Sequence, residues 1–145
     1  MLKLNCKYGK IEMVYFILTY EINFEGTVNF MTINDIKDLL EARLLTGEKM
    51  LDHEVHTACG SDMMSDVLAF VKDQAVLLTG LMNPQVIRTA EMMDIICIVF
   101  VRGKTPDEAV VNLAEEMNIA ILSTDLRMFE ACGRLYTNGL GGHTK

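Results

Sequence analysis

The sequence lacks any apolar run long enough to cross a membrane. Its longest N-terminal run, Met13–Tyr20, has less than half of the roughly 20 residues that a spanning helix requires. Lysines precede this run, as in a signal peptide, but Glu21 ends it and no small-x-small cleavage site follows. The sequence therefore predicts a cytoplasmic protein with no membrane partner.

The sequence also has fewer basic than acidic residues. The formal net charge is −7 at pH 7, and the lysines and arginines form no basic stripe along the chain. Proteins that bind nucleic acids neutralise phosphates with clustered cations. We therefore predict no nucleic-acid partner.

Paired cysteines are absent. The four cysteines are far apart and form no C-x-x-C motif: Cys6, Cys59, Cys97 and Cys132. This spacing favours free thiols in a reducing compartment over a disulfide framework. His53, His56 and Cys59 do recur every three residues, but an extended segment points His53 and His56 to opposite faces, and no second ligand cluster exists. We predict neither a metal nor a cofactor.

A phosphate-binding loop is missing too. Gly103-Lys104-Thr105 resembles the end of a Walker A loop, which requires an earlier glycine in the pattern GxxxxGK[ST]. Ile98 stands at that glycine position, within an apolar run typical of a strand, and Pro106 follows the motif at once. The sequence thus predicts no kinase or ATPase site.

A complete strand–helix–strand unit is present in residues 75–105. Ala75–Thr79 and Ile95–Val101 are short apolar runs bounded by turn residues, as expected of strands buried on both faces of a parallel sheet. Between them, Asn83 can cap a helix whose first residue is Pro84.

Similar units are predicted on either side. Thr32 opens a helix, Arg43–Leu45 is extended, and residues 51–58 include a second extended run. Ser61-Asp62 is expected to cap a helix that reaches Val71, with Met64, Val67, Leu68 and Val71 facing inward. Thr105 is expected to begin a capping box, with Pro106 first and Glu108 third in a helix that buries Ala109, Val110, Leu113, Ala114 and Met117. Ile119–Leu122 is the last predicted strand and Leu126–Tyr136 the last helix.

Strands that alternate with helices indicate an α/β fold, a three-layer sandwich with a mostly parallel four- to five-stranded sheet and helices on both faces. We expect one domain over residues 31–140, preceded by an N-terminal extension (1–30) and followed by a frayed tail (141–145). The extension is interpreted as translated upstream sequence; the alternative is an added edge element.

In such sheets, ligands bind beyond the carboxyl ends of the strands. The turns expected there supply hydroxyls, free N–H groups and cations, which suit a small anionic ligand. A purely structural reading is also open, because most of these residues are good turn or cap formers. The Ser65-Asp66 pair has no structural explanation. The candidate ligand-binding residues are Ser61, Asp62, Ser65, Thr79, Gly80, Asn83, Arg102, Gly103 and Thr124.

Four segments resemble a known family. They are SDMMSDVLAF, LLTG, IVFVRGKTPDEAVVNLAEEMNIAILSTD and MFEACGRLY, and together they are similar to DRTGG domains. The resemblance covers Met31 to Leu140 and is closest to small stand-alone DRTGG proteins encoded near iron-only hydrogenase and ferredoxin-like genes in anaerobic bacteria. The motif that names the family is expected near Gly80–Gln85, where this sequence has no Asp-Arg pair.

The resemblance implies a non-catalytic regulatory or interaction module. DRTGG domains resemble the N-terminal domain of HPr kinase/phosphorylase and accompany CBS domains and phosphotransacetylase modules. We therefore expect a homodimer that senses a small anionic ligand such as a nucleotide, with a protein partner in a hydrogenase or redox system. The alternative is a phosphotransferase-related enzyme or an HPr serine kinase-like protein.

Overall fold

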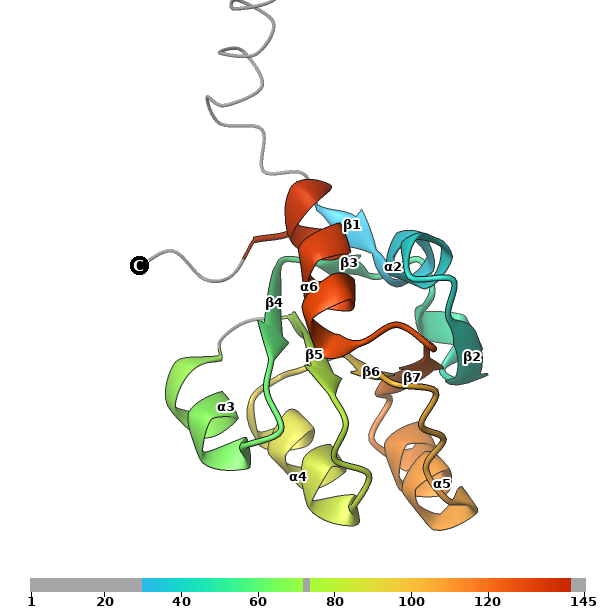
Figure 1. Ribbon diagram of the computed structural model, residues 1–145. Helices are drawn as coiled ribbons and strands as arrows, with labels where there is room; N and C mark the ends of the chain where they lie inside the picture. Colours follow the sequence, from blue (N-terminus) through green and yellow to red (C-terminus); the bar gives the residue numbers. More distant parts are fainter. Residues whose placement is uncertain (1–29, 72–73, 142–145) are drawn as a thin grey trace, which may run out of the picture.

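The structure is a computed structural model that describes residues 30–71 and 74–141 (Figure 1). The N-terminal extension and the tail that the sequence predicts lie outside these residues, apart from Phe30 and Gly141. The elements in chain order are β1 (Met31–Thr32), α2 (Ile33–Leu39), β2 (Arg43–Thr46), the 3-10 helix η1 (Glu48–Met50), β3 (Glu54–Val55), β4 (Thr57–Gly60), α3 (Met64–Phe70), β5 (Ala75–Thr79), α4 (Pro84–Met92), β6 (Cys97–Phe100), α5 (Glu108–Glu116), β7 (Ala120–Ser123) and α6 (Met128–Thr137).

The main sheet has five strands in the order β2-β7-β6-β5-β4. β4, β5, β6 and β7 run parallel to one another, and β2 pairs antiparallel with β7 at one edge. A second, two-stranded sheet pairs β1 with β3. The predicted strand–helix–strand unit is confirmed as β5, α4 and β6, because their apolar runs are buried throughout.

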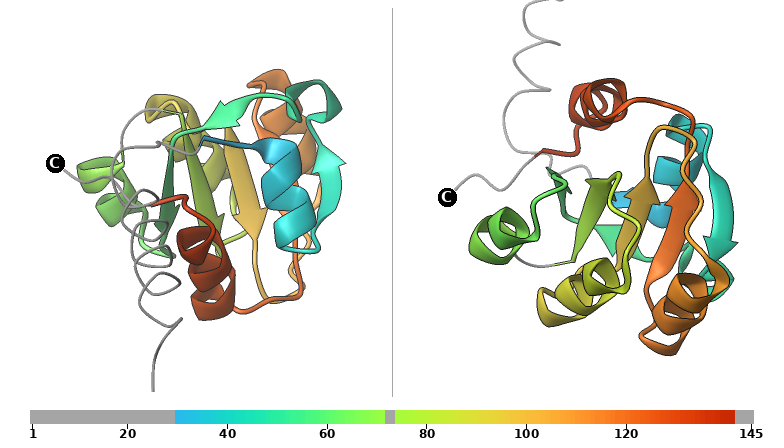
Figure 2. Two further views of the ribbon diagram at one scale, coloured as in Figure 1. Left: turned by 90° about the horizontal axis from the view of Figure 1, so that it is seen from above. Right: turned by 60° about the horizontal axis from the view of Figure 1, so that its bottom comes forward.

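Helices cover both faces of this sheet. α3, α4 and α5 lie side by side on one face, and α2 and α6 lie on the other (Figures 1 and 2). The helical connections between β4 and β7 all pass over the first face, and the chain then returns after β7 to the face of α2, where it enters α6. The three-layer α/β sandwich with a mostly parallel sheet is therefore confirmed.

Two hydrophobic clusters separate the layers. Val76 and Leu78 of β5 pack in the cluster beneath α2 and α6, whereas Leu77 between them packs in the cluster beneath α3, α4 and α5. This alternation is the period of two of a strand. Each fully buried side chain of this size contributes roughly 1.5–3 kcal/mol, so both faces of the central strands hold the sheet in place.

Two predicted helix starts are confirmed. Thr32 caps α2 through a reciprocal capping box: its Oγ1 accepts from the Asp35 N–H at 3.1 Å, and Asp35 Oδ2 accepts from the Thr32 N–H at 2.9 Å. Asn83 stands at the N-cap of α4 with Pro84 at the first position, although the Asn83 side chain makes no capping hydrogen bond.

Two other predicted caps are wrong. α5 begins at Glu108, and Asp107, not Thr105, caps it by accepting from the Val110 N–H at 3.0 Å. α3 begins at Met64 with Met63 at the cap position, because the Asp62 side chain is bound to β5.

Two residues predicted to face inward are exposed instead. They are Leu68 of α3, with 43% of its surface exposed, and Ala109 of α5. For α3 the reason is its place at one end of the row of helices α3, α4 and α5, where no further helix covers its outer side (Figure 1).

Candidate functional site

The carboxyl ends of β4, β5, β6 and β7 lie at one edge of the sheet, as their parallel register requires. All residues predicted to bind a ligand lie at these strand ends or in the turns and helix starts that follow them. This is the edge at which open α/β sheets bind ligands.

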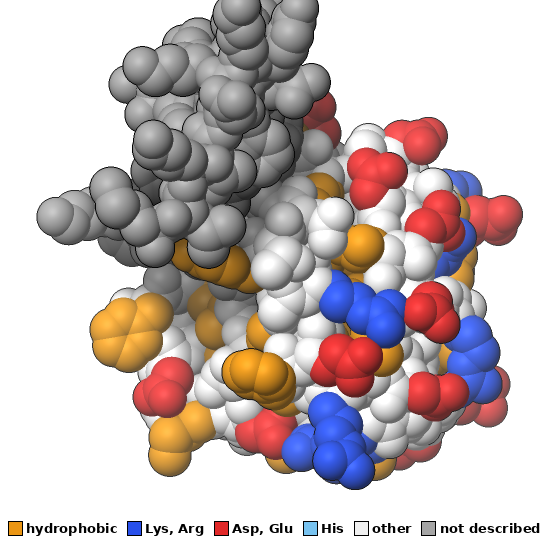
Figure 3. All heavy atoms as spheres, turned by 45° about the horizontal axis from the view of Figure 1, so that its top comes forward, with side chains coloured by type: hydrophobic (Ala, Val, Ile, Leu, Met, Phe, Trp, Pro, Cys, Tyr) orange, Lys and Arg blue, Asp and Glu red, His pale blue; other side chains and the backbone are white. Residues whose placement is uncertain are grey.

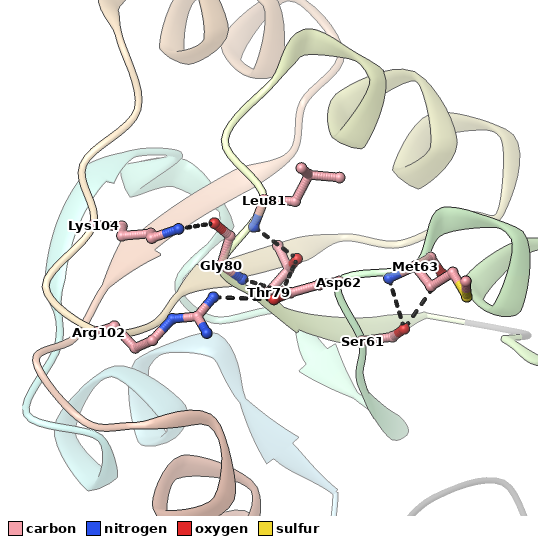
Figure 4. A network of polar contacts seen from close by, with 8 residues as sticks. All are labelled: Ser61, Asp62, Met63, Thr79, Gly80, Leu81, Arg102 and Lys104. Carbon is pink, nitrogen blue, oxygen red and sulfur yellow. Dashed lines mark hydrogen bonds and ion pairs between the residues drawn. The ribbon is translucent and has the colours of Figure 1, made fainter.

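A polar network centred on Asp62 joins three of these turns (Figure 4). Asp62 Oδ1 accepts from the Gly80 N–H at 2.6 Å and from Thr79 Oγ1 at 3.0 Å. Its other oxygen, Oδ2, forms an ion pair with Arg102 Nη2 at 3.0 Å. The structure thus brings together Asp62, Thr79, Gly80 and Arg102, from the ends of β4, β5 and β6.

The network holds the Asp62 carboxyl in its charged form. The Gly80 N–H lowers the pKa of Asp62 from its ordinary value, partial burial opposes this, and Arg102 and Thr79 lower the pKa further. The side chains of Arg102 and Asp62 are 43% and 49% exposed. Water therefore screens the pair, and an ion pair of this kind contributes roughly 0–1 kcal/mol to folding.

The turn after β6 places Arg102 in an uncommon backbone conformation. Arg102 and Gly103 both have φ of 66°, a left-handed value that few non-glycine residues adopt. Two hydrogen bonds to the β7–α6 connection hold this turn in place. The Arg102 N–H donates to the Leu126 carbonyl at 2.8 Å, and the Gly103 N–H donates to the Thr124 carbonyl at 2.9 Å. Local strain fixed in this way is common at ligand-binding sites.

Gly80 lies in contact with two cations. A Cβ atom at Gly80 would overlap the Arg102 guanidinium, so the absence of a side chain is what lets Arg102 lie against this backbone. From the other side, Lys104 Nζ donates to the Gly80 carbonyl at 2.6 Å. Figure 4 shows both cationic side chains directed at the Thr79–Gly80 turn.

Asp62 and Arg102 form an acidic–basic pair beside Gly80 in space, although the sequence has no Asp-Arg pair within Gly80–Gln85. Asp62 precedes Gly80 by 18 positions along the chain, and Arg102 belongs to the turn after the next strand. The three turns supply one acidic and two basic groups around a single glycine.

Two predicted site residues, Thr124 and Ser61, form hydrogen bonds within the protein, and their part in ligand binding stays a prediction. Thr124 is 2% exposed; its Oγ1 donates to the Leu40 carbonyl at 2.7 Å and accepts from the Leu126 N–H at 3.2 Å. Ser61 Oγ accepts from the Met63 N–H at 3.0 Å and so shapes the turn that leads into α3.

Ser65 and Asn83 are exposed at the first turn of α3 and at the start of α4. Within the described part of the chain, neither side chain is joined to the Asp62 network by a hydrogen bond. Their part in ligand binding stays a prediction, as does that of Gly103, whose nearest side chain is Asp125.

The sequence did not single out Lys104 or Ser123 for this site. Ser123 Oγ donates to the Lys104 carbonyl at 2.8 Å and fixes the turn that carries Lys104. A usable signal was the position of Lys104 two residues after Arg102, because both residues lie in one turn at the end of a buried strand.

A second feature is an apolar hollow of about 310 Å³ between the edge strand β4 and α6. Figure 3 shows hydrophobic side chains gathered at one end of the face it presents, while charges of both signs intermingle over the rest. Phe129 and Tyr136 of α6 are 91% and 72% exposed. The residues lining the hollow are Ala58, Gly60, Phe129, Cys132, Gly133, Tyr136 and Leu140.

The cysteines in the described residues are free thiols. Cys97 is fully buried in β6, and burial raises its pKa. Cys59 and Cys132 lie near the apolar hollow, and burial is the main cause that raises the pKa of each. The raised pKa values keep all three thiols protonated at neutral pH.

Among residues 30–71 and 74–141, no group of three or more His, Cys, Asp or Glu side chains is placed to hold a metal ion. In the same part of the chain, every helix is too short or too polar to cross a membrane. The chemistry at the Asp62 network is that of hydrogen-bond donors and cations, an arrangement that can hold an anion.

Comparison with solved structures gives a similar fold. One crystal structure contains the CBS and DRTGG domains of the regulatory region of a Clostridium perfringens pyrophosphatase, complexed with its activator, diadenosine tetraphosphate. The two chains are 19% identical, with a TM-score of 0.62 over 75% of this chain and 47% of that one. The present chain thus spans about half the length of this neighbour.

The search of curated proteins finds no match. The family comparison finds the DRTGG domain over residues 35–137, which is most of the chain. That range runs from the capping box of α2 to the end of α6 and includes the whole Asp62 network. The chain belongs to the DRTGG domain family.

Proposed function

We propose that this protein is a regulatory module that binds a small anionic ligand, such as a nucleotide, at the carboxyl edge of its sheet. The observation that carries the proposal is the convergence of Arg102 and Lys104 on the Thr79–Gly80 turn. The related pyrophosphatase region, a regulatory region with a nucleotide activator, supports the choice of ligand class.

The donors at this edge match an anionic group. The Arg102 guanidinium offers a planar fork to phosphate or carboxylate oxygens, and the Lys104 ammonium offers a point charge. Both lie at the rim of the network, where Arg102 is nearly half exposed. A ligand can therefore reach them without opening the core.

A thermal-shift screen of nucleotides and phosphorylated metabolites tests the proposal. A ligand at 100 times its Kd stabilises the folded state by about 2.7 kcal/mol, a shift of several degrees. Arg102→Ala should weaken binding of the hit at least about tenfold, because one charge-assisted contact is lost. It should leave stability nearly unchanged.

Lys49→Ala is the matched control. Lys49 is an exposed cation of η1, and it lines a hollow with Asn118 and Ile119, which precede β7 at the opposite edge of the sheet. This variant should bind as the unchanged protein does. A screen without hits, or an Arg102→Ala chain that unfolds, would mean that the network is purely structural.

The competing function is an enzyme of phosphotransferase type. It would need a phosphate loop at residues 98–105, but Ile98, which stands where that loop requires glycine, lies within β6. We expect no ATP hydrolysis and no transfer to HPr. Phosphate release above a buffer blank, abolished by Lys104→Ala, would contradict the regulatory proposal.

We also propose a homodimer in which α6 packs against α6 of a second copy. Phe129 and Tyr136 flank the small residues Cys132 and Gly133 on one helical face, and the space above Gly133 is open. An antiparallel second helix would place its rings against these small residues, which is a self-complementary contact.

Sedimentation measures this assembly. Phe129→Ser should convert the dimer to a monomer, whereas Phe70→Ser, at a ring on α3 that is 73% exposed, should not. A monomeric unchanged protein would refute the homodimer. The association with a hydrogenase or redox partner rests on the family resemblance, and co-purification from the native host tests it.

A further inference from the structure

The Asp62 carboxylate holds the donors that an anionic ligand would use. It accepts from the Gly80 N–H at 2.6 Å and from the Thr79 hydroxyl, and it neutralises Arg102. A phosphate or carboxylate placed at this edge would seek the same amide and the same guanidinium. The free protein therefore already contains an anion in its proposed anion site.

We infer that Asp62 is an internal counter-anion that the ligand's anionic group displaces on binding. This inference rests on the function proposed above and adds a mode of regulation to it. In the free protein Asp62 holds the Gly80 turn and Arg102 in place. In the bound protein the ligand holds the Gly80 turn and Arg102. The turn between β4 and α3, which carries Asp62, then has no bond to either of them.

The fold allows this exchange because Asp62 and its donors belong to different elements. Gly80 and Arg102 follow the central strands β5 and β6, whereas Asp62 follows β4, the edge strand of the sheet. The side chain of Asp62 is about half exposed, so rotation of that side chain alone can free the donors. Ser61 Oγ keeps its bond to the Met63 N–H during such a rotation and preserves the turn.

Displacement also selects the ligand. A singly charged carboxylate would replace Asp62 with a group of the same charge and gain little, since the ligand also loses its own water and freedom of motion. A phosphate monoester carries up to two negative charges and three acceptor oxygens. It can satisfy the Gly80 N–H and Arg102 together and reach Lys104 as well. The site should therefore favour phosphate groups over carboxylates.

Calorimetric titration with ATP, inorganic phosphate and acetate tests the inference on the full chain. Asp62→Ala removes the competing anion and should bind ATP about tenfold more tightly than the unchanged protein. Asp62→Asn keeps an acceptor for Gly80 and Thr79 but loses the charge, so it should bind with an intermediate affinity. Acetate should bind more weakly than phosphate in each case.

Asp66→Asn is the matched control. It removes the same charge from an exposed position one turn further along, in α3. It should change ATP affinity by less than about twofold, since exposed charges beyond direct contact are screened. An equal gain in Asp66→Asn and Asp62→Ala would overturn the inference, because the effect would then be general charge repulsion.

The remaining outcomes separate the inference from the proposed function. If the unchanged protein binds ATP and Asp62→Ala binds equally or less well, Asp62 supports the site or contacts the ligand; the inference fails and the function stands. If no variant binds any probe, both fail. If Asp62→Ala does not fold, the ATP affinity of Asp62→Asn tests the inference in its place. The amide NMR signals of Asp62 and Met63 in the unchanged protein give a second test, because the inference requires them to shift when ATP is added.

Discussion

Gly80 lies against the Arg102 guanidinium, and an added methyl group at this position would overlap it. Gly80→Ala should therefore push the Arg102 guanidinium away from the Gly80 N–H, so that one anionic group can no longer reach both donors, and weaken ligand binding. Stability should fall by less than about 1 kcal/mol, because the obstructing atoms are the end of a flexible, half-exposed side chain. Thermal melting and ATP titration of the same preparation measure both effects.

A second glycine is the control for this change. Gly133 lies within α6, and an added Cβ atom would meet nothing within 4 Å. Gly133→Ala should not alter ATP binding, and in the monomeric Phe129→Ser background it should raise stability by roughly 0.5–1 kcal/mol, since alanine loses less backbone entropy in a helix. Binding lost equally in both variants would show that Gly80 has no special relation to Arg102.

The pKa of Asp62 makes part of the stability depend on pH. Its pKa is held below 3.8, the ordinary value, so the folded protein binds this proton less tightly than the unfolded chain does. The resulting stabilisation is fully present above 3.8 and is lost as pH falls through the lower folded pKa. Asp62→Asn should therefore lower the melting temperature at neutral pH, and the difference from the unchanged protein should shrink as the pH falls below 3.8.

Asp35 also has a lowered pKa, chiefly because the Thr32 hydroxyl donates to it. Asp35 is present in both the unchanged protein and Asp62→Asn, so its contribution to the pH dependence of stability cancels when their melting temperatures are compared. A constant difference in melting temperature across the range would mean that the Asp62 charge does not stabilise the fold.

At the scale of single residues, the sequence predicted which side chains gather at the strand ends but not their bonds. Asp62 was assigned to a cap because Ser61-Asp62 precedes a helical pattern, and its true partners lie 17, 18 and 40 positions away. Contacts of that separation depend on the register of β4, β5 and β6. Local patterns do not contain that register.

At the scale of elements, the start of α5 offers a direct test. Asp107 accepts from the Val110 N–H at 3.0 Å, and the loss of such a cap costs about 1 kcal/mol. Asp107→Ala should destabilise the protein by that amount. Thr105→Ala should have little effect, because Thr105 is exposed and precedes the cap. Chemical denaturation measures both, and a larger loss at Thr105 would support the capping box that the sequence suggested.

Elements with strong local signals were predicted well. Ala75–Thr79 was predicted with the bounds that the structure gives, because a continuous apolar run between turn residues has few other interpretations. The pairing of β1 with β3 involves two residues on each side, too few to show a period. The antiparallel direction of β2 was not predictable either, because it depends on a distant partner, β7.

At the scale of the whole molecule, the α/β sandwich followed from the alternation of strands and helices, and the structure confirms it. The network around Gly80 is a consequence of that architecture, because parallel strands bring the turns after β4, β5 and β6 to one edge. The apolar hollow beside α6 was not foreseen. It depends on α6 crossing to the other face of the sheet and packing near β4, which no local pattern shows.

A chain that begins at Met31 should fold nearly as well as the full chain. The first elements of the domain are complete from that residue: β1 pairs with β3, and Thr32 closes the capping box of α2.

The one described residue that is lost is Phe30. Its ring is 47% exposed and lies 4.5 Å from the His56 ring, measured between centroids. A contact of this kind contributes roughly 0.5–1.5 kcal/mol. A chain that begins at Phe30 is therefore the control, and the two truncated chains should differ by roughly 2–6 °C in melting temperature. The Phe30 chain should melt with the full-length protein. If it melts several degrees lower, residues 1–29 stabilise the domain and the boundary at Met31 is wrong.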